Sequence, residues 1–343
     1  MRVDAGWSDF GWQGVRARVP EEWNLGRVDG GPDTGYVRLD DAEIVRAEIE
    51  WRTARRGTAL PLSALVDRYL AGLQQRASKG GLEFAVERPA HFLGDASWLA
   101  GREHDVFAWR ADYEAYNLVV RTRPERIVLI RVLGRIGEAV LPVVRAVMAS
   151  LRDDSQAEEW LWSVYGLTFA MPAAFRLDSH ELRSGHIKLT FARGRQTCRV
   201  ERLSMAQTLL RGQALAAWYP VFFRRQLRDM VIDIAPQAVR GDEGLRVTGR
   251  PRSRWRQLLR PLPWIDPRQR VHMDGLVWHC AATNKICIVD HQFRRPDERG
   301  DLTERVAHGY LCHQEAAEAE PRGHAELAAG AEPGSRVGAH RAG

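Results

Sequence analysis

Two cysteines in the C-terminal half have the spacing of neighbours across a β-hairpin. Cys280 and Cys287 lie in LVWHCAATNKICIVDH (residues 276–291), where two apolar runs flank a polar break. With a two-residue turn at Thr283 and Asn284, the two cysteines lie directly opposite each other, with Cβ atoms about 4.5–5.5 Å apart on one face. Two thiolates at this separation could bind a metal ion or, with some adjustment, form a disulfide.

A histidine and a further cysteine follow on the last predicted helix. His308 and Cys312 are four residues apart, so they share one face of that helix, which should pack on the sheet. Three interpretations of the group are open: cysteines buried as small apolar residues, a redox pair, and a tetrahedral zinc site. Zinc is the one cofactor considered. Its candidate ligands are Cys280, Cys287, His308 and Cys312.

A basic segment is the second candidate site. Residues 249–270 (GRPRSRWRQLLRPLPWIDPRQR) contain seven arginines against one acid, Asp266. Such a segment could dock on a protein partner, lie at an anionic membrane surface, hold a nucleic-acid backbone, or be a plain surface loop. The candidate partner-binding residues are Arg254, Trp255, Arg256, Leu259, Arg260 and Trp264.

Composition and motifs favour a soluble protein without catalytic activity. The chain has 343 residues, of which 45% are hydrophobic and 27% charged, with a net charge of +6. It contains no nucleophile elbow, phosphate-binding loop or His-Glu-x-x-His motif. No stretch has the roughly 18 unbroken apolar residues of a membrane-spanning helix, and no signal peptide is evident. We therefore expect a cytoplasmic location and reduced thiols, and the sequence nominates no catalytic residue.

The element pattern of the chain occurs twice. GVRARVPEEWNL at residues 14–25 matches GLTFAMPAAFRL at 166–177 without a gap, and alternating segments that predict strands follow in both places. An amphipathic helix comes next in each half, with Pro61 at the start of the first and Pro220 either beginning or kinking the second. A hairpin and a last helix close each half, and Asp301 and Glu304 resemble a capping box.

This order of elements predicts an α+β fold: two tandem αβα-sandwich domains, each an antiparallel sheet covered by helices. The predicted boundaries are 1–155 for the first domain and 156–313 for the second, with the basic insertion at 249–270. The tail, 314–343, is rich in Ala, Gly, Pro and charge and should be disordered.

The opening strand with its Pro, aromatic and Leu, the amphipathic helix, the Gly-centred strand and the long hairpin resemble the PsbP-like superfamily. That group includes the Ran-binding Mog protein, the PsbP subunit of photosystem II and bacterial DcrB-like proteins. The resemblance implies a sandwich used mostly to bind other proteins, with no shared catalytic residues. We therefore expect a non-enzymatic adaptor or accessory protein that binds an unknown protein partner through its sheet faces and the basic segment. The alternatives are a metal- or thiol-dependent protein and a binder of anionic lipid or nucleic acid.

Overall fold

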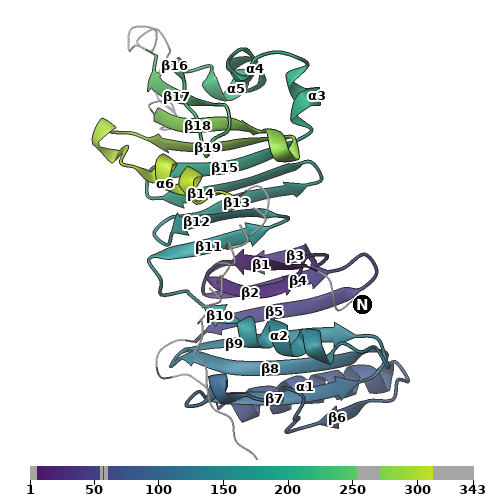
Figure 1. Cartoon of the computed structure of the whole chain (residues 1–343). Helices are drawn as coiled ribbons and strands as arrows, with labels where there is room; N and C mark the ends of the chain where they lie inside the picture. Colours follow the sequence, from purple (N-terminus) through teal and green to yellow (C-terminus); the bar gives the residue numbers. More distant parts are fainter. Residues whose placement is uncertain (1–5, 55–56, 58–60, 253–270, 312–343) are drawn as a thin grey trace, which may run out of the picture. The chain divides into compact units, whose positions relative to one another are not determined.

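A seven-stranded antiparallel sheet dominates the first half of the chain. The computed structural model describes residues 6–54, 57, 61–252 and 271–311, and Figure 1 shows their strands and helices. The sheet order is β3-β4-β5-β9-β8-β7-β6. Its strands are β3 (Asn24–Gly30), β4 (Thr34–Asp40), β5 (Val45–Thr53), β6 (Ala85–Glu87), β7 (His104–Arg110), β8 (Glu114–Arg123) and β9 (Arg126–Gly134).

The second half contains a sheet of the same size and the same order, β13-β14-β15-β19-β18-β17-β16. Its strands are β13 (Arg176–Arg183), β14 (His186–Arg193), β15 (Gln196–Ser204), β16 (Met230–Pro236), β17 (Gly244–Pro251), β18 (His272–Cys280) and β19 (Lys285–Phe293). Both sheets are antiparallel throughout, which follows from the short connections between most successive strands.

A third sheet joins strands from both halves. Its order is β10-β2-β1-β11-β12, with β1 (Trp7–Trp12), β2 (Val15–Pro20), β10 (Arg152–Asp153), β11 (Glu159–Val164) and β12 (Leu167–Pro172). The hairpins β1–β2 and β11–β12 turn at Gln13-Gly14 and Tyr165-Gly166, and all four of these residues have positive φ. Two-residue turns with positive φ have a backbone twist that matches the right-handed twist of the strands on either side. At the centre of this sheet, Gly11 lies opposite Ser163.

The registers of the two seven-stranded sheets correspond residue by residue. A β-bulge follows Leu25 in the first sheet and Leu177 in the second, the same place in the repeated phrase. Counting along the ladders from this bulge, the cross-strand pair Glu48–Arg131 of the first sheet corresponds to Arg199–Asp290 of the second. The repeated phrase therefore marks equivalent strands. The predicted domain boundaries at residues 155 and 156 stay a prediction.

Within the described residues, the helices are fewer than the strands. In the first half, α1 (Leu62–Lys79) and α2 (Leu141–Ser150) lie on opposite faces of the sheet (Figure 1). The predicted helix start at Pro61 is confirmed, because Pro61 is the N-cap of α1. In the second half, α3 (Ala206–Leu210), α4 (Leu215–Phe222) and α5 (Arg224–Leu227) replace one long helix, and α6 (Leu302–His308) follows β19.

The predicted fold class is wrong. One apolar cluster runs from the seven-stranded sheets into the five-stranded sheet and includes Trp12, Trp162 and Phe191. Sheet therefore packs on sheet where a helical layer was expected. On the other face of the first sheet, α1 packs mainly on β7 and β8. The structure is mostly antiparallel β in three sheets, so the α+β sandwich covered by helices and the PsbP-like description are both incorrect.

Two local predictions also need correction. Pro220 lies inside α4, and the helical segment breaks into short pieces around it, as expected where proline removes a backbone donor. Asp301 is the N-cap of α6, but its side chain makes no capping hydrogen bond, so the capping box at Asp301 and Glu304 does not form.

Candidate functional site

The cysteine hairpin has a different register from the predicted one. A 3₁₀ turn at Ala281–Thr283 and a left-handed Asn284 lengthen the loop, so Cys280 lies opposite Lys285, and Cys287 lies opposite Trp278. The predicted direct pairing of Cys280 with Cys287 is therefore wrong, and the two lie diagonally on one face. Both are fully buried in the apolar cluster. Thr283 donates a hydrogen bond to the Cys280 sulfur at 3.2 Å.

The remaining predicted metal ligands do not join them in the described part of the chain. His308 is exposed at the end of α6, whereas the hairpin thiols are buried. Across residues 6–252 and 271–311, apart from the short gap around residue 57, no three His, Cys, Asp or Glu side chains are placed to hold a metal. Cys312 lies outside the described residues, so zinc binding stays a prediction.

The basic segment is likewise untested. Strand β17 ends at Pro251 and β18 begins at His272, and residues 253–270 lie outside the described part of the chain. All six predicted contact residues, Arg254, Trp255, Arg256, Leu259, Arg260 and Trp264, fall in this gap. Binding of lipid, nucleic acid or protein by this segment therefore stays a prediction.

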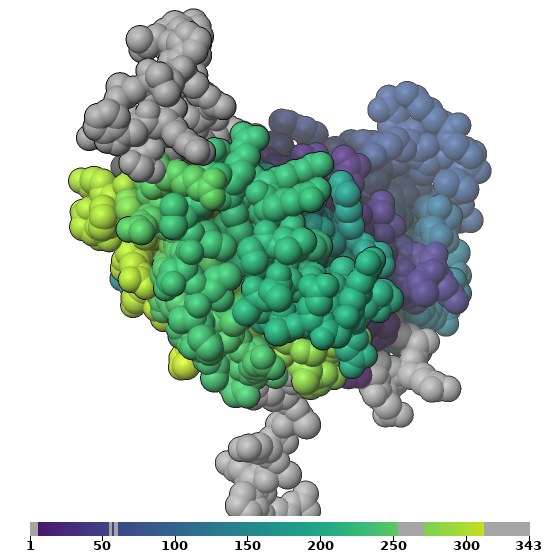
Figure 2. Space-filling model, turned by 90° about the horizontal axis from the view of Figure 1, so that it is seen from above, coloured from purple at the N-terminus to yellow at the C-terminus, as the bar shows by residue number. Residues whose placement is uncertain are grey.

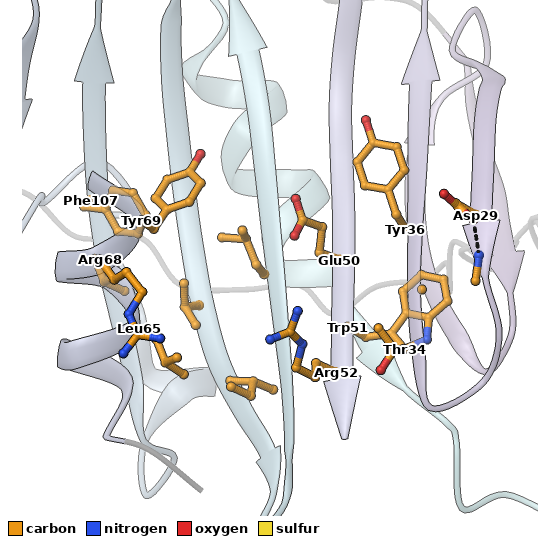
Figure 3. Close-up of a pocket in the computed structure, with 16 residues that line it drawn as sticks. Asp29, Thr34, Tyr36, Glu50, Trp51, Arg52, Leu65, Arg68, Tyr69 and Phe107 are labelled. Atoms are coloured by element: carbon orange, nitrogen blue, oxygen red, sulfur yellow. Dashed lines mark hydrogen bonds between the residues drawn. The ribbon is translucent and has the colours of Figure 1, made fainter. Parts of the chain in front are cut away.

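A groove on the first sheet is the main candidate site within the described residues. It lies between α1 and the face of β4, β5 and β9, and its volume is about 690 Å³. Figure 3 shows α1 on one side of it and Tyr36 on the other. We call it the α1 groove. Its floor is apolar and consists of Leu65 and Val66 from α1, Phe107, Val119, Ile127 and Leu129. A volume within about 300–1,000 Å³ is usual for sites that bind small molecules.

Strand alternation explains why this groove exists. On β5, Ala47, Ile49 and Trp51 point into the apolar cluster, so Glu48, Glu50 and Arg52 point to the opposite face. Helix α1 covers that face only near β7 and β8. The polar side chains of β5 are therefore left beside the apolar flank of α1.

Two tyrosines stand beside the groove in a charged cluster. Tyr36 donates a hydrogen bond to Glu48, and Arg131 donates to the same carboxylate. Burial, followed by the hydrogen bond to Glu48, raises the pKa of Tyr36 well above its usual value. The Arg131 guanidinium lies 5.3 Å from the centre of the Tyr69 ring, a cation–π distance. Glu48 and Arg131 thus satisfy each other and hold the two aromatic rings in place.

The rim of the groove carries charges that nothing else satisfies within the described residues. The side chains of Glu50, Arg52 and Arg68 are exposed and make no hydrogen bond or ion pair with another described residue. In Figure 3, Arg68 of α1 and Arg52 of β5 both extend into the space between helix and sheet, and Glu50 lies further along β5. Among the described residues, the polar part of the lining consists of Asp29, Thr34, Tyr36, Glu50, Arg52, Arg68 and Tyr69.

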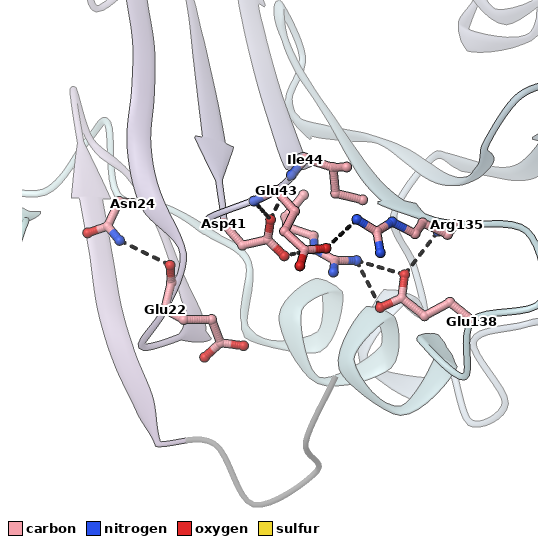
Figure 4. A network of polar contacts seen from close by, with 8 residues as sticks. Glu22, Asn24, Asp41, Glu43, Ile44, Arg135 and Glu138 are labelled. Carbon is pink, nitrogen blue, oxygen red and sulfur yellow. Dashed lines mark hydrogen bonds and ion pairs between the residues drawn. The ribbon is translucent and has the colours of Figure 1, made fainter.

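A second polar cluster is saturated internally. Arg46 on β5 is buried and donates to Asp41 at 2.5 Å and to Glu138 at 2.8 and 3.0 Å. Asp41 also accepts the backbone N–H groups of Glu43 and Ile44, and Glu43 pairs with Arg135 at the surface (Figure 4). The cluster ties the β4–β5 turn to the segment before α2. The charged groups of this cluster pair with one another, so we assign the cluster a structural role and not a binding role.

This cluster predicts a pH-dependent stability. Burial by itself raises the pKa of Asp41 and of Glu138, but their hydrogen bonds to backbone N–H groups and to Arg46 outweigh burial and lower both pKa values below their usual range. A carboxylate whose pKa is lowered by folding adds stability above its unfolded pKa and loses it as the pH falls. The double variant Asp41→Asn/Glu138→Gln should therefore be less stable than wild type at pH 7 by about 2 kcal/mol.

The difference in the free energy of unfolding between wild type and the double variant should decrease as the pH falls below about 4.5, because wild type then loses the same contacts. Urea unfolding at several pH values measures it. Glu43→Gln is the matched control and should change stability by less than about 0.5 kcal/mol, because its ion pair with Arg135 is exposed. A gap that stays constant down to pH 3 would contradict this account.

The sheet faces were predicted binding surfaces, but no residue of the α1 groove was among the predicted site residues. The repeat contains a signal that could have indicated the groove. On β5, the alternating Glu48, Glu50 and Arg52 make one face of the strand wholly charged, whereas the second copy has Leu203 in place of Arg52. What covers a face depends on helix placement, which the strand pattern does not show.

Comparison with known proteins gives little further information. No family model matches the sequence, and no curated protein matches it. One similar solved structure is the immunity protein TplEi of the T6SS from Pseudomonas aeruginosa, complexed with "L" peptide. It is 14% identical, with a TM-score of 0.36 over 90% of this chain and 98% of that chain. The apo structure of TplEi is 11% identical, with a TM-score of 0.37 over 91% and 99%. Similarity at this level assigns no function.

One general property concerns membranes. Among the helices that the structure describes, none is both long and apolar enough to span a bilayer.

Proposed function

We propose that the chain is a non-enzymatic binding protein that receives a protein partner in the α1 groove. The observation that carries this proposal is the combination of an apolar floor with a rim of charges that no described residue satisfies. Interfaces have this composition, with a desolvated apolar centre and polar groups around it. The groove is open along the sheet, which suits an extended contact with a macromolecule better than enclosure of a small ligand.

Aromatic side chains at the groove support the same role. Tyr36 and Tyr69 lie on opposite sides of it, and both are held by the Glu48–Arg131 pair. Tyrosine is enriched among the residues that dominate binding energy, because it offers a large rigid surface and a polar end. Rings that are fixed before binding lose little conformational entropy when a partner arrives.

The test uses a variant that fills the groove without disturbing the core. Glu50 is exposed on β5, so Glu50→Trp should place an indole in the groove and leave the fold intact. Ser179→Trp on β13 is the matched control, because Ser179 is also exposed on a strand but belongs to the second sheet. Circular dichroism and thermal unfolding should show both variants folded.

A partner purified with wild type from the source cells, then prepared separately, should bind wild type at one to one in calorimetry. We expect Glu50→Trp to weaken that binding at least about tenfold, the loss of roughly one well-packed contact, and Ser179→Trp to leave it unchanged. Equal binding by wild type and Glu50→Trp would exclude the groove as the contact surface.

A further inference from the structure

The second sheet shows what the face of the α1 groove looks like when it is covered. Following the ladder registers, Glu50 and Leu129 of the first sheet correspond to Glu201 and Ile288 of the second. The next pair on the same face, Arg52 and Ile127, corresponds to Leu203 and Ile286. The two faces therefore present equivalent positions.

A segment of the chain itself covers these positions in the second half. Leu203, Ile286 and Ile288 are at most 4% exposed. They pack in one apolar cluster with Trp218 and Tyr219 of α4 and with Phe223, which follows α4 directly. Phe223 also lies over Arg199, with the guanidinium 4.8 Å from the ring centre. Figure 2 views the molecule from above, with the teal to green part of the chain that contains α3 to α5 at the surface.

The first half has no such segment at this position within the residues described. Helix α1 packs on Phe107 and Val119, one strand or more away from β5, and leaves Ile127 and Leu129 only half-buried. Glu50 and Arg52 are exposed, although their counterparts Glu201 and Leu203 are buried. The α1 groove is thus the part of this sheet face that a short aromatic helix occupies in the other half.

The charges at the groove indicate a ligand whose own charges differ from those of α4 and α5. Arg52 stands where the second sheet has Leu203, and Arg68 of α1 faces it across the groove (Figure 3). In the second half, the Glu201 carboxylate lies 2.6 Å from the His186 ring nitrogen and 3.3 Å from an Arg199 guanidinium nitrogen. The Glu50 carboxylate has no such neighbour among the described residues. A ligand must bring carboxylates to the two arginines, because two exposed cations beside an apolar floor attract acidic groups.

We infer that the α1 groove binds a short aromatic helix of a protein partner, in the place that α4 and α5 take on the second sheet, with acidic residues facing Arg52 and Arg68. This inference rests on the proposed function and names the chemistry of the partner. An amphipathic helix in a groove is a common mode of peptide recognition, in which a few apolar anchors supply affinity and flanking charges supply specificity.

Two synthetic peptides test the inference. The first has residues 214–225 as they stand, ALAAWYPVFFRR, and the second has the same sequence with both terminal arginines replaced by glutamates. Binding of each to the full chain is measured by fluorescence anisotropy at low salt. We expect the glutamate peptide to bind about tenfold more tightly, and the difference to shrink at high salt, because exposed charges are screened.

Charge reversal in the protein locates the site. Arg52→Glu should reverse the order of the two peptides, whereas Arg183→Glu, an exposed arginine of the second sheet, should leave it unchanged. Replacing the Trp, Tyr and second Phe of the glutamate peptide by alanine should abolish binding, because they supply the apolar anchors.

The outcomes separate this inference from the proposed function. If neither peptide binds, or if Arg52→Glu leaves the order unchanged, the helical acidic ligand is wrong, even where Glu50→Trp still loses its partner. If wild type forms dimers that the glutamate peptide dissociates, the occupant is a second copy of this chain, which also overturns the inference.

Discussion

Trp162→Ala should lower the free energy of unfolding by about 4 kcal/mol, the usual cost of removing a fully buried tryptophan side chain. Trp162 on β11 has no solvent exposure. Its ring lies edge-on to Trp12 of the first half at 5.0 Å and to Phe191 of the second sheet at 4.9 Å. The cavity would therefore open where apolar residues of the five-stranded sheet meet those of the second seven-stranded sheet. Unfolding in urea measures the loss.

Trp98→Ala is the matched control for this prediction. Trp98 is half-buried at the edge of the same cluster, so its removal should cost clearly less, about 2 kcal/mol or below. Equal losses for the two variants would show that the contact between β11 and the second seven-stranded sheet contributes little to stability.

Asp290→Ala should destabilise the chain by about 3–5 kcal/mol, because it leaves a buried charge without its main partner. Asp290 is 2% exposed and accepts from the Arg199 Nε at 2.6 Å, under the cover of α4 and α5. The double variant Arg199→Met/Asp290→Leu should recover most of this loss, since an apolar pair of similar size replaces the ion pair without desolvating charge.

The equivalent pair in the first half supplies the comparison. Arg131 occupies the position of Asp290, and its partner Glu48 is 17% exposed beside the open groove. Arg131→Ala should therefore cost less than half as much as Asp290→Ala, because water can solvate the carboxylate that remains. If the two single variants cost the same, the cover provided by α4 and α5 does not change the energetics of this position.

The repeat could be predicted from the sequence because its features depend on local residue patterns. Pro20 and Pro172 end equivalent strands, and the bulges after Leu25 and Leu177 fall at the same place in the two phrases. Strand alternation and the proline before α1 likewise depend only on neighbouring residues. Such features predicted most strands, α1 and α2 correctly.

The errors concern contacts between distant residues and loop geometry. Pairing of β1 with β11 joins segments about 150 residues apart, and no local pattern indicates it. Without this pairing, the opening strands were assigned to a sheet under helices. In the cysteine hairpin, the left-handed Asn284 changed the loop length and therefore the partner of every residue along both strands. The α1 groove was not predicted because the strand pattern does not show which part of a sheet face the helices leave uncovered.

The pairing of Gly11 with Ser163 has a consequence for how the two halves can differ. These residues are equivalent in the repeat, so the two hairpins meet as the subunits of a symmetric dimer would. Residues 154–158 connect the halves between β10 and β11, so the association is intramolecular, at an effective concentration on the order of millimolar. A dimer of identical chains must present the same face twice. Covalent linkage removes that requirement, and it allows one face to remain open while its counterpart is closed by the chain's own helices.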